Sequence, residues 1–557
     1  MGRKLWERCS RDAFGALYNP FVVALAAGTL SITSFQRYIA QDAFFLSSFA
    51  EAYGMALQSA DDEEAKASIA SLQHAVHEEL RLHSSFAEKW GLDFTQPDAP
   101  NPATTKYTDF LLQTASECVD RASGTRDGEL LKVTESNAEQ RLHRCARTIT
   151  AMTPCMRLYA FLGQELERHT GMGCKHPYQE WIETYSSVDF EASASQIEQL
   201  LDKLSVTFNE EVQASLEIIY KQAMALEVEF FSAQSLSTEA VQVPYFKLAS
   251  AAKERLVFVS DFDSTCTVAD SSSILADLTV KIAASSNTKN ATSLQQQWDE
   301  LVKEYLEEYE EVLSEALTLT GGSSTYKENE LHELLEKMSM FEQTANEKVV
   351  KAGVLQGLST ADIQEVAKLM PLRPGCAHLL QRLRQEETHI DVQILSVCWS
   401  STFIKGVFDN CGVEIPRICA NELSVTGSVS DGDIMRSVET ALDKEQFFDQ
   451  ILRGLSTKSE STTPRLVGDS RAVYIGDSVT DLPCLLRADI GIVIGKSATL
   501  DRVADAFAIR RQPLYAGVLQ AERDQCDRSS GWRKGSGVLY TVSSWHEIEA
   551  FLLGYQE

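Results

Sequence analysis

The 557-residue chain has little positive charge. It contains 51 lysine and arginine residues against 80 aspartate and glutamate residues, which gives a formal net charge of −29. This balance argues against nucleic acid as a partner, because phosphate backbones are bound by clustered Lys and Arg. It does not exclude a phosphorylated small molecule, since a bound Mg²⁺ can supply the missing positive charge.

Long apolar runs and closely paired cysteines are also absent from the sequence. No apolar stretch reaches the ~18 residues of a membrane-spanning helix, and the longest one near the start, Phe21 to Ala27, ends at Gly28. We therefore predict no membrane span. The 12 cysteines include no CxxC pair and are not spaced like a small disulfide scaffold. They predict a reducing compartment and mostly inert, buried thiols.

The first residues do not resemble an organelle-targeting segment. They mix basic side chains with Glu7 and Asp12, whereas transit peptides are rich in serine and poor in acidic residues. We predict a cytoplasmic protein, with a mitochondrial form if an upstream start codon adds a transit peptide.

The length of the chain predicts several domains, because 557 residues exceed one ordinary hydrophobic core. From Ser10 to about Ala233, apolar residues recur at spacings of three and four, which predicts an α-helical bundle. Glycine and proline mark the predicted breaks between helices, the first of them at Gly54. The predicted domains are a helical domain at residues 1–236, a linker at 237–254 and an α/β domain at 255–557.

Two carboxylates and one thiol lie within apolar segments of the predicted bundle. A carboxylate in apolar surroundings is costly unless it is paired, so Asp42 and Glu227 are either functional groups or side chains that point to solvent. Cys155 and Tyr159 are four residues apart on one helix and share a face. Such a cysteine is either core packing or a nucleophile, and the spacing leaves both interpretations open.

Several short motifs of the first domain occur together in one known family. They are Asn19-Pro20-Phe21-Val22, Gly28-Thr29-Leu30, Phe35, Tyr38, Gln41, Asp42, Pro154-Cys155, Tyr159, Gly163, His176-Pro177-Tyr178, Trp181-Ile182, Thr184-Tyr185, Glu227 and Phe230-Phe231. Through these motifs the chain resembles the TenA family of aminopyrimidine hydrolases, which salvage the pyrimidine half of degraded thiamin. The resemblance implies an all-α, haem-oxygenase-like bundle and a homo-oligomer built through this domain.

The same resemblance implies a role for each matched residue. Cys155 would be the nucleophile that attacks the ring carbon bearing the amino group, Asp42 would hold the ring nitrogen and the departing amine, and Glu227 would shuttle protons. The pocket would be lined by Tyr107, Tyr159 and Tyr185. At two positions the chain departs from the family: Phe45 stands where many members have tyrosine, and Phe230-Phe231 replaces the usual Phe-Trp.

One helix of the first domain carries a run of histidines. The segment His77-Glu78-Glu79-Leu80-Arg81 lacks the second histidine of a zinc-protease helix. We therefore interpret His74, His77, Glu78 and His83 as surface or structural residues.

The second domain opens on an apolar, β-prone stretch that runs from Leu256 into Asp261 and Asp263. It predicts a buried strand of a parallel sheet, and ligands bind beyond the carboxyl ends of such strands. Residues two apart in a strand point to the same face, where paired like charges require a cation or a shared proton. This arrangement suits metal-assisted phosphoryl transfer; the alternative is a polar turn in which Asp caps a helix.

Later motifs follow further predicted strands or open a helix. Ser396 ends the strand from Val392, Lys444 opens a helix, and Gly476-Asp477 through Asp481 follows the strand from Ala472. The sequence from about residue 270 to about residue 370 predicts a helical cap inserted after the first strand. This ordered set resembles the haloacid dehalogenase superfamily of phosphatases, over about Arg255 to Leu553, and implies a Rossmann-like fold.

That second resemblance implies an aspartyl-phosphate mechanism. Asp261 would be the nucleophile, and Asp263 the acid for the leaving alcohol and then the base for water. Ser396 and Lys444 would hold the phosphate, with Lys405 as a rival lysine. The cofactor would be Mg²⁺, and its predicted ligands are Asp261, Asp263, Asp477 and Asp481.

A TenA-like domain followed by this phosphatase domain resembles a family of bifunctional thiamin-salvage proteins in plants. The resemblance implies hydrolysis of thiamin monophosphate to thiamin and phosphate, and hydrolysis of an aminopyrimidine to hydroxymethylpyrimidine. Two alternatives stay open. The phosphatase could act on another small phosphometabolite, and the helical domain could be a non-catalytic binding or oligomerisation module.

Overall fold

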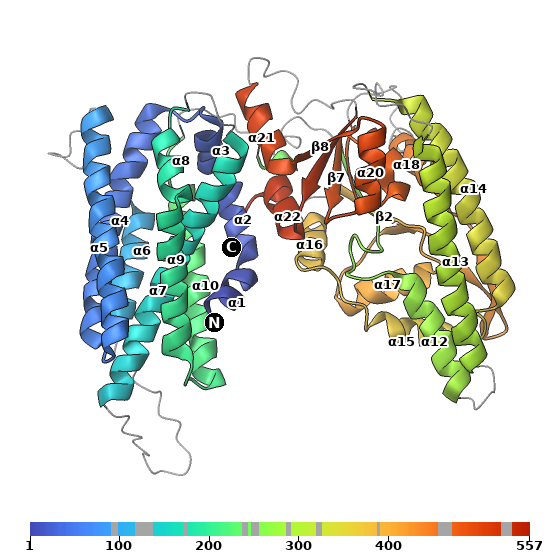
Figure 1. Ribbon diagram of the computed structural model, residues 1–557, viewed down its shortest axis with the longest axis horizontal. Coiled ribbons are helices and arrows are strands. Elements are labelled where there is room, and N and C mark those ends of the chain that lie inside the picture. The colour runs from blue at the N-terminus through green and yellow to red at the C-terminus, as the bar shows by residue number, and fades with distance from the viewer. Residues whose placement is uncertain are drawn as a thin grey trace, which may run out of the picture. The chain divides into compact units, whose positions relative to one another are not determined.

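The computed structural model separates the chain into two units, each with its own core. One contains Met1–Val243 with the segments that begin at Val518 and Gly554, and the other contains Pro244–Gly517 with the segment that ends at Leu553 (Figure 1). Most of the predicted linker lies outside the described residues, and no helix among those described is long and apolar enough to cross a bilayer. The structure describes residues 1–90, 99–116, 137–170, 176–236, 243–246, 255–285, 291–318, 326–386, 390–454, 470–524 and 537–556.

The first unit is all-α, as the apolar spacing predicted. The start of its third helix illustrates the local signals: the Asn19 side chain accepts a hydrogen bond from the Phe21 amide, and Pro20 fills the first helical position. That helix ends at Gly28, whose φ of 76° is left-handed. The helices are α1 Gly2–Arg8, α2 Ser10–Leu17, α3 Pro20–Ala27, α4 Ile32–Ser59, α5 Glu63–Trp90, α6 Pro102–Ser116, α7 Asn137–Thr170, α8 Gln179–Ser186, α9 Val188–Ser205 and α10 Glu210–Ser232.

Gly54 does not interrupt a helix, so the break predicted there was wrong. It lies inside α4, which continues to Ser59. A Cβ atom at Gly54 would come within 3.3 Å of the Gln73 amide nitrogen on α5, and that amide donates a 2.9 Å hydrogen bond to the Ala50 carbonyl. The close packing of α4 and α5 thus offsets the low helix propensity of glycine.

The chain end also packs into the first unit. The Tyr555 hydroxyl donates a 2.6 Å hydrogen bond to Asp12, and its ring lies where a Cβ on Gly15 would approach within 2.5 Å. Thr29 donates a 3.1 Å hydrogen bond to Glu522 from the segment that begins at Val518. The last residues of the chain are therefore part of the helical unit.

The second unit is built on a seven-stranded sheet with the order β3-β2-β1-β6-β7-β9-β8. Every neighbouring pair in this sheet is parallel. Strand β1, Arg255–Ser260, is flanked on its two sides by β2 and β6, so that Leu256 pairs with both Ile390 and Arg471. The winding direction switches at β1, which is where ligands bind in open α/β sheets.

The strands predicted from Leu256, Val392 and Ala472 are present, as is the strand that the apolar run from Ile490 to Ile494 predicts, and several others accompany them. The sheet strands are β1 Arg255–Ser260, β2 Ile390–Leu395, β3 Arg417–Cys419, β6 Ser470–Gly476, β7 Ile490–Ile494, β8 Arg510–Pro513 and β9 Val538–Val542. A separate antiparallel hairpin pairs β4 Glu422–Thr426 with β5 Val429–Met435. Apart from β9, whose run VLYTV is β-prone, these additional strands are short or polar, and β8 contains Pro513, so the apolar pattern did not reveal them.

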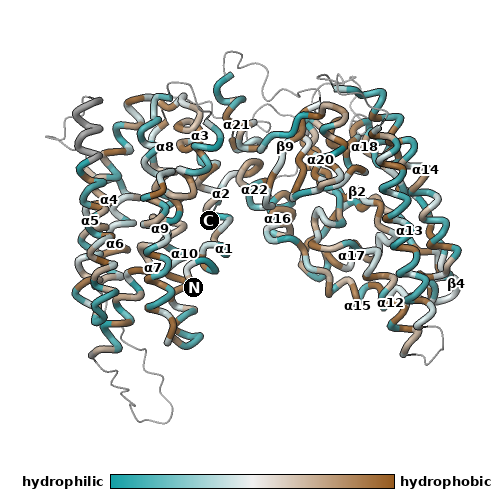
Figure 2. The backbone as a smooth tube through the Cα atoms, viewed as in Figure 1, coloured by the Kyte–Doolittle hydropathy of each residue, from teal (hydrophilic) through white to brown (hydrophobic). Residues whose placement is uncertain are grey.

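Helices of the second unit surround the sheet, and five described helices fall between β1 and β2 in the chain. The first four of them lie within the cap predicted at about 270–370. Leu334, Leu335 and Met338 of α14 are buried against Leu313 of α13, and in Figure 2 both helices alternate between hydrophobic and hydrophilic residues. The helices are α12 Ser271–Ser285, α13 Ala291–Thr318, α14 Glu328–Ala352, α15 Thr360–Ala367, α16 Cys376–Glu386, α17 Ser401–Asn410, α18 Ala441–Gly454, the 3₁₀ helix η1 Val479–Asp481, α19 Leu482–Arg487, α20 Ala498–Ala506 and α22 Trp545–Leu553. Helix α21, Leu514–Arg523, begins in this unit and continues into the segment of the first unit that starts at Val518.

Candidate active sites

The first candidate site lies at the carboxyl end of β1. Asp261 is the first residue after the strand, and its backbone amide donates a 2.9 Å hydrogen bond to the Ile475 carbonyl of β6. The side chain is almost fully buried. Burial raises the pKa of Asp261 to about 7, and the nearby Lys444 ammonium opposes that shift.

Lys444 connects Asp261 to a second carboxylate. Its ammonium donates to Asp261 Oδ1 and to Asp481 Oδ1, each at 2.7 Å, and all three side chains are buried. Burial alone would lower the pKa of Lys444, but the two carboxylates outweigh it and raise the pKa. Lys405, the rival lysine, is exposed on α17, so only Lys444 is part of this site.

Asp263 has different neighbours from Asp261. Its carboxylate accepts hydrogen bonds from the Ser271 amide at 2.7 Å and from the Ser271 hydroxyl at 2.8 Å. Burial raises its pKa well above the usual range, and the charges of Asp270 and Asp261 add to the rise. The chain turns sharply after it, because Ser264 adopts a φ of 54°. Asp263 thus favours the protonated form, which a general acid requires.

Three of the four predicted metal ligands come together. Carboxylate oxygens of Asp261, Asp477 and Asp481 lie within 4.8 Å of one another, and hard oxygen donors of this kind suit Mg²⁺. The side chain of Asp263 is not part of this group, because Ser271 holds it. The donor chemistry therefore fits the cation through Asp261, Asp477 and Asp481.

Asp481 is held by more donors than its neighbours. Its second oxygen accepts from the Asp477 and Ser478 amides and from the Ser478 hydroxyl, at 2.8 to 3.2 Å, and Tyr474 donates to Oδ1 at 2.9 Å. A Cβ on Gly476 would collide with this carboxylate, which explains the glycine in the motif. Asp477 instead accepts a 2.8 Å bond from the Thr265 hydroxyl, and burial raises its pKa to about 6.

Ser396 follows β2, the strand next to β1. Ser260 pairs with Ile394, so Ser396 and Asp261 both lie just past that pair at the same sheet edge. The Ser396 side chain is fully buried and its hydroxyl oxygen accepts a 3.1 Å hydrogen bond from the Cys398 amide. The hydroxyl proton therefore remains available for a ligand oxygen.

The second candidate site lies inside the helical unit. Cys155 of α7 and Glu227 of α10 are buried and hydrogen-bonded to each other, and Tyr107 of α6 donates a 2.7 Å bond to the Glu227 carboxylate. Burial raises the pKa of the Cys155 thiol, and nearby carboxylates raise it further. Burial raises the pKa of Glu227 to about 7. The resting pair is thus a neutral thiol beside a carboxyl group that titrates near neutrality and that, when ionised, can accept a proton.

Asp42 and two predicted tyrosines complete the group. Asp42 of α4 is buried, and burial together with Glu79 and Glu227 raises its pKa well above the usual range. Tyr159 accepts a 3.2 Å bond from the Tyr38 hydroxyl, and its ring centre lies 4.9 Å from that of Tyr185. All six residues predicted for this site are therefore buried in one unit.

Glu79 belongs to this site, although no motif of the sequence points to it. Its carboxylate accepts a 2.6 Å hydrogen bond from the Tyr185 hydroxyl, and burial raises its pKa to about 7. The charge of Glu79 acts on both Asp42 and Cys155. The signal was the helical pattern, because Leu72 and Val76 are buried on α5 and Glu79 continues the same face.

Phe45 packs within the same cluster of rings. Its ring centre lies 4.7 Å from Tyr107 and 6.1 Å from Phe230. The position where many family members carry a tyrosine therefore faces the predicted pocket, but contributes only apolar surface.

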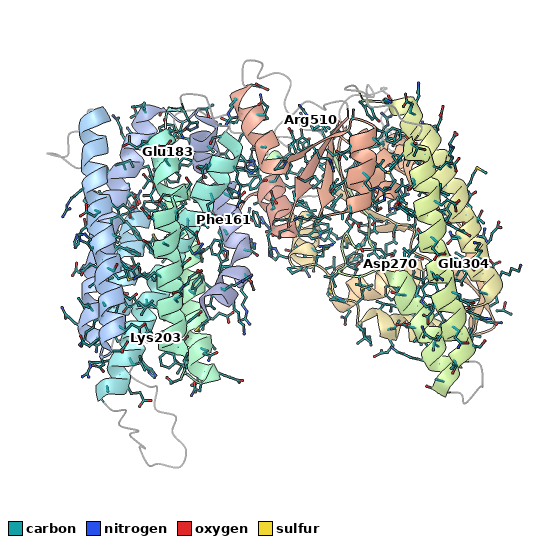
Figure 3. All side chains as sticks on the ribbon, viewed as in Figure 1. Phe161, Glu183, Lys203, Asp270, Glu304 and Arg510 are labelled. Atoms are coloured by element: carbon teal, nitrogen blue, oxygen red, sulfur yellow. The ribbon has the colours of Figure 1, made fainter. Side chains whose placement is uncertain are left out.

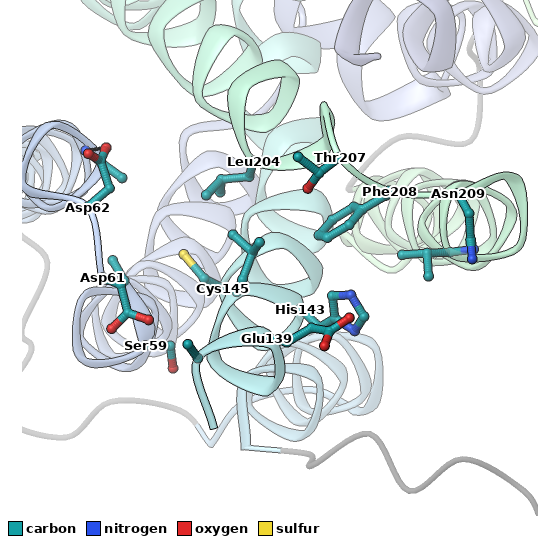
Figure 4. A pocket seen from close by; sticks show the side chains of 15 residues that line it. Ser59, Asp61, Asp62, Glu139, His143, Cys145, Leu204, Thr207, Phe208 and Asn209 are labelled. Carbon is teal, nitrogen blue, oxygen red and sulfur yellow. Dashed lines mark hydrogen bonds between the residues drawn. The ribbon is translucent and has the colours of Figure 1, made fainter. Parts of the chain in front are cut away.

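A separate pocket of about 520 Å³ lies elsewhere in the helical unit (Figure 4). Its lining includes Asp61, His143, Cys145 and Phe208, but none of the predicted catalytic residues. At 1.5 Å per helical residue, Cys145 lies roughly 15 Å along α7 from Cys155. This pocket is therefore distinct from the buried site.

The fold and the two sites define a fusion of a TenA-type helical domain with a parallel-sheet α/β domain that carries a helical insertion. Residues 14–118 and 141–237 match the model of the TENA/THI-4/PQQC family. A bifunctional TH2 protein of Arabidopsis thaliana, described as mitochondrial, is 41% identical over 99% of this chain and 89% of its own length. The chain belongs to the family of bifunctional TH2 proteins, which confirms the resemblance found in the sequence.

Single domains of the chain are similar to other proteins. An aminopyrimidine aminohydrolase of Halalkalibacterium halodurans is 28% identical over 41% of this chain and 92% of its own length. Among solved structures, a TenA family transcription regulator from Silicibacter sp. TM1040 is 22% identical, with a TM-score of 0.34 over 41% of this chain and 93% of its own. A phospho-aspartyl intermediate analogue of phosphoserine phosphatase is 16% identical, with a TM-score of 0.29 over 45% of this chain and 90% of its own.

Proposed function

We propose that the α/β unit hydrolyses thiamin monophosphate to thiamin and phosphate through an aspartyl phosphate on Asp261. The observation that carries the proposal is the Lys444 ammonium, which lies 2.7 Å from both Asp261 and Asp481 at the carboxyl end of β1. A buried nucleophile beside a fixed positive charge suits attack on a phosphate dianion. The relationship to a TH2 protein, and the fusion to a TenA domain, support thiamin monophosphate as the substrate.

The proposed reaction has two displacements at phosphorus. In the first, an Asp261 oxygen bonds to phosphorus, the bond to the thiamin oxygen breaks, and Asp263 gives that oxygen its proton. In the second, ionised Asp263 takes a proton from water, the water oxygen bonds to phosphorus, and the bond to Asp261 breaks. Lys444 and Ser396 hold phosphate oxygens throughout. Mg²⁺, held by Asp261, Asp477 and Asp481, would neutralise phosphate charge.

For the helical unit we propose an aminopyrimidine aminohydrolase that yields hydroxymethylpyrimidine. In the net reaction one C–N bond breaks, ammonia leaves and a hydroxyl group from water takes its place. Cys155 gives its proton to Glu227 and its sulfur bonds to the ring carbon, the C–N bond breaks, and Glu227 passes that proton to the departing amine. Water then gives a proton to Glu227 while its oxygen bonds to the same carbon, the C–S bond breaks, and Cys155 takes the proton back. Asp42 and the tyrosines hold the ring. The relationship to an aminopyrimidine aminohydrolase supports this assignment.

A phosphate-release assay tests the phosphatase. Thiamin monophosphate is compared with nucleotides, phosphoserine and sugar phosphates, each with Mg²⁺ and with EDTA. We expect a clear preference for thiamin monophosphate and loss of turnover in EDTA. Equal rates on thiamin monophosphate and sugar phosphates would contradict the proposed substrate specificity. Full activity in EDTA would contradict the proposed requirement for Mg²⁺.

The remaining proposals concern assembly and location. We propose a homo-oligomer built through the helical unit, which light scattering on the purified protein tests; a monomeric mass at micromolar concentration contradicts it. For location, the relative's name supports a mitochondrial form, alongside the cytoplasmic form expected from the first residues. Imaging of fluorescent fusion proteins, each translated from one natural start codon, distinguishes the mitochondrial form from the cytoplasmic form.

A further inference from the structure

The two long cap helices carry aromatic rings on the sides that pack together. Tyr305 and Tyr309 of α13 lie against Phe341 of α14, with ring centres 5.1 and 5.9 Å from it. The two tyrosine rings are stacked on each other at 5.8 Å. Phe341 is buried and the tyrosines are half-buried. Part of this aromatic surface is thus left for another group to contact.

Glu342 lies beside these rings without a cation. It accepts a 2.9 Å hydrogen bond from the Tyr305 hydroxyl, and burial raises its pKa to about 7, with Asp270 adding to the rise. Within the described ranges, no lysine or arginine makes an ion pair with Glu342. A desolvated carboxylate of this kind gains from a positively charged neighbour.

Trp399 links the cap to the phosphatase site. It stands in the loop that follows Ser396, and its indole N–H donates a 3.0 Å hydrogen bond to Asn346 of α14. Asn346 is one helical turn from Glu342, so the two share a face. Trp298 of α13 approaches Trp399 with ring centres 6.2 Å apart, and both indoles are half-buried.

The cap residues and the reacting carboxylates share a neighbour. Ser271, which holds the Asp263 carboxylate, directly follows Asp270, and the charge of Asp270 acts on both Asp263 and Glu342. Figure 3 labels Asp270 at the start of α12, beside α13. Under the proposed function, Asp263 protonates the leaving group. Asp270 thus connects Glu342 with the carboxylate that is proposed to protonate the leaving group.

We propose that Trp298, Tyr305, Glu342, Asn346 and Trp399, the cap cluster, bind the leaving group of the phosphatase and select a cationic aromatic heterocycle. Aromatic faces attract cations, flat rings stack on indoles, and Glu342 supplies the opposite charge. This specificity rests on the proposed phosphatase function and deepens it, because the positively charged thiazolium of thiamin belongs to this class. A neutral leaving group would leave the half-buried Glu342 without a counter-charge.

The test uses the full-length protein and three phosphate esters. Thiamin monophosphate has a cationic aromatic leaving group, phosphocholine a cationic one that is not aromatic, and phenyl phosphate an aromatic one that is neutral. Glu342→Gln keeps the shape of the side chain and an acceptor for Tyr305. Its matched control is Glu333→Gln, the same change at an exposed position of α14.

For Glu342→Gln we expect kcat/KM on thiamin monophosphate to fall at least tenfold, with phenyl phosphate within about twofold of wild type. Phosphocholine turnover should fall too, and Glu333→Gln should change none of the three. Trp399→Leu should lose thiamin monophosphate selectivity, while Trp399→Phe retains most of it. Equal losses on all three esters, or none, would overturn the proposal. If Glu342→Gln does not fold, Trp298→Leu against Trp298→Phe provides the same comparison.

Product inhibition separates this inference from the proposed function. Thiamin, as an inhibitor of phenyl phosphate hydrolysis, should bind at least tenfold more weakly to Glu342→Gln than to wild type. Suppose that the wild-type protein shows no preference for thiamin monophosphate, yet inhibition by thiamin is weaker in Glu342→Gln. The proposed substrate is then wrong, but the proposed role of the cap cluster in binding cationic heterocycles is supported. If the preference is present but Glu342→Gln leaves it and the inhibition unchanged, the substrate stands and the cap cluster is wrong.

Discussion

The ammonium of Lys444 lies 2.7 Å from the carboxylate of Asp261, and both side chains are buried at the end of β1. The same ammonium bonds to Asp481, so one positive charge stabilises two carboxylates that otherwise repel each other. This contact ties the stability of the α/β unit to its proposed chemistry, because removing the lysine leaves buried negative charge unpaired.

Lys444→Met should therefore lower both stability and activity. We expect a loss of about 3–5 kcal/mol in the free energy of unfolding, the usual result of breaking a buried pair, and loss of phosphate release. Urea denaturation and the phosphate assay measure the two effects. Lys405→Met, at an exposed position, is the control and should stay within about 0.5 kcal/mol of wild type. A stable, active Lys444→Met protein would contradict the assigned role.

Asp261→Asn should abolish phosphatase turnover without unfolding the protein. An amide nitrogen cannot attack phosphorus, and the substitution is nearly isosteric with aspartate. We expect a loss of several powers of ten in kcat, as for other covalent nucleophiles. Phosphate release measures it, and circular dichroism checks the fold. Retention of more than a few per cent of activity would point to another nucleophile.

Cys155→Ser should remove aminopyrimidine hydrolysis and leave phosphatase turnover within about twofold, because a hydroxyl is a far poorer nucleophile than a thiolate. The assays are ammonia release from an aminopyrimidine and phosphate release from thiamin monophosphate. Cys145→Ser, on the same helix but outside the site, is the matched control and should keep both activities. A large drop in phosphatase turnover in folded Cys155→Ser protein would show that the two sites are coupled.

Glu79→Gln should change how stability depends on pH. In the folded protein the pKa of Glu79 is raised to about 7, so the folded state binds a proton that the unfolded chain has released once the pH exceeds about 4.3. Stability therefore falls as pH rises from that value through 7. A glutamine side chain does not titrate, so the variant should lose this contribution.

Thermal and urea unfolding between pH 5 and 8 measure the effect of Glu79→Gln. Its slope of unfolding free energy against pH should be shallower by up to about 1.4 kcal/mol per pH unit, one proton's worth. Glu78→Gln, at an exposed neighbouring position, should keep the wild-type slope. Matching slopes for wild type and Glu79→Gln would mean that Glu79 is not buried as a titrating carboxyl group.

The sequence alone determined the chemistry that depends on local order in the chain. An apolar strand that runs into Asp261 and Asp263 predicts a parallel sheet with carboxylates at its edge. The motif from Gly476 to Asp481 predicts two more carboxylates, Asp477 and Asp481, at the same edge. Helical spacing likewise indicated the bundle. These patterns follow from the backbone periods of strands and helices, so they can be read without coordinates.

Only the tertiary structure decided which distant side chains meet. It showed that Lys444, and not Lys405, contacts Asp261. It also showed that Ser271 binds the Asp263 carboxylate, which leaves the carboxylates of Asp261, Asp477 and Asp481 close enough together to hold a cation. It also placed Glu79 beside Tyr185, a contact that the motifs of the sequence did not indicate. Burial and pairing depend on packing between elements far apart in the chain, and they set the charge of a carboxyl group or lysine. The spacing of residues along one helix or strand does not indicate which residues of another element pack against it.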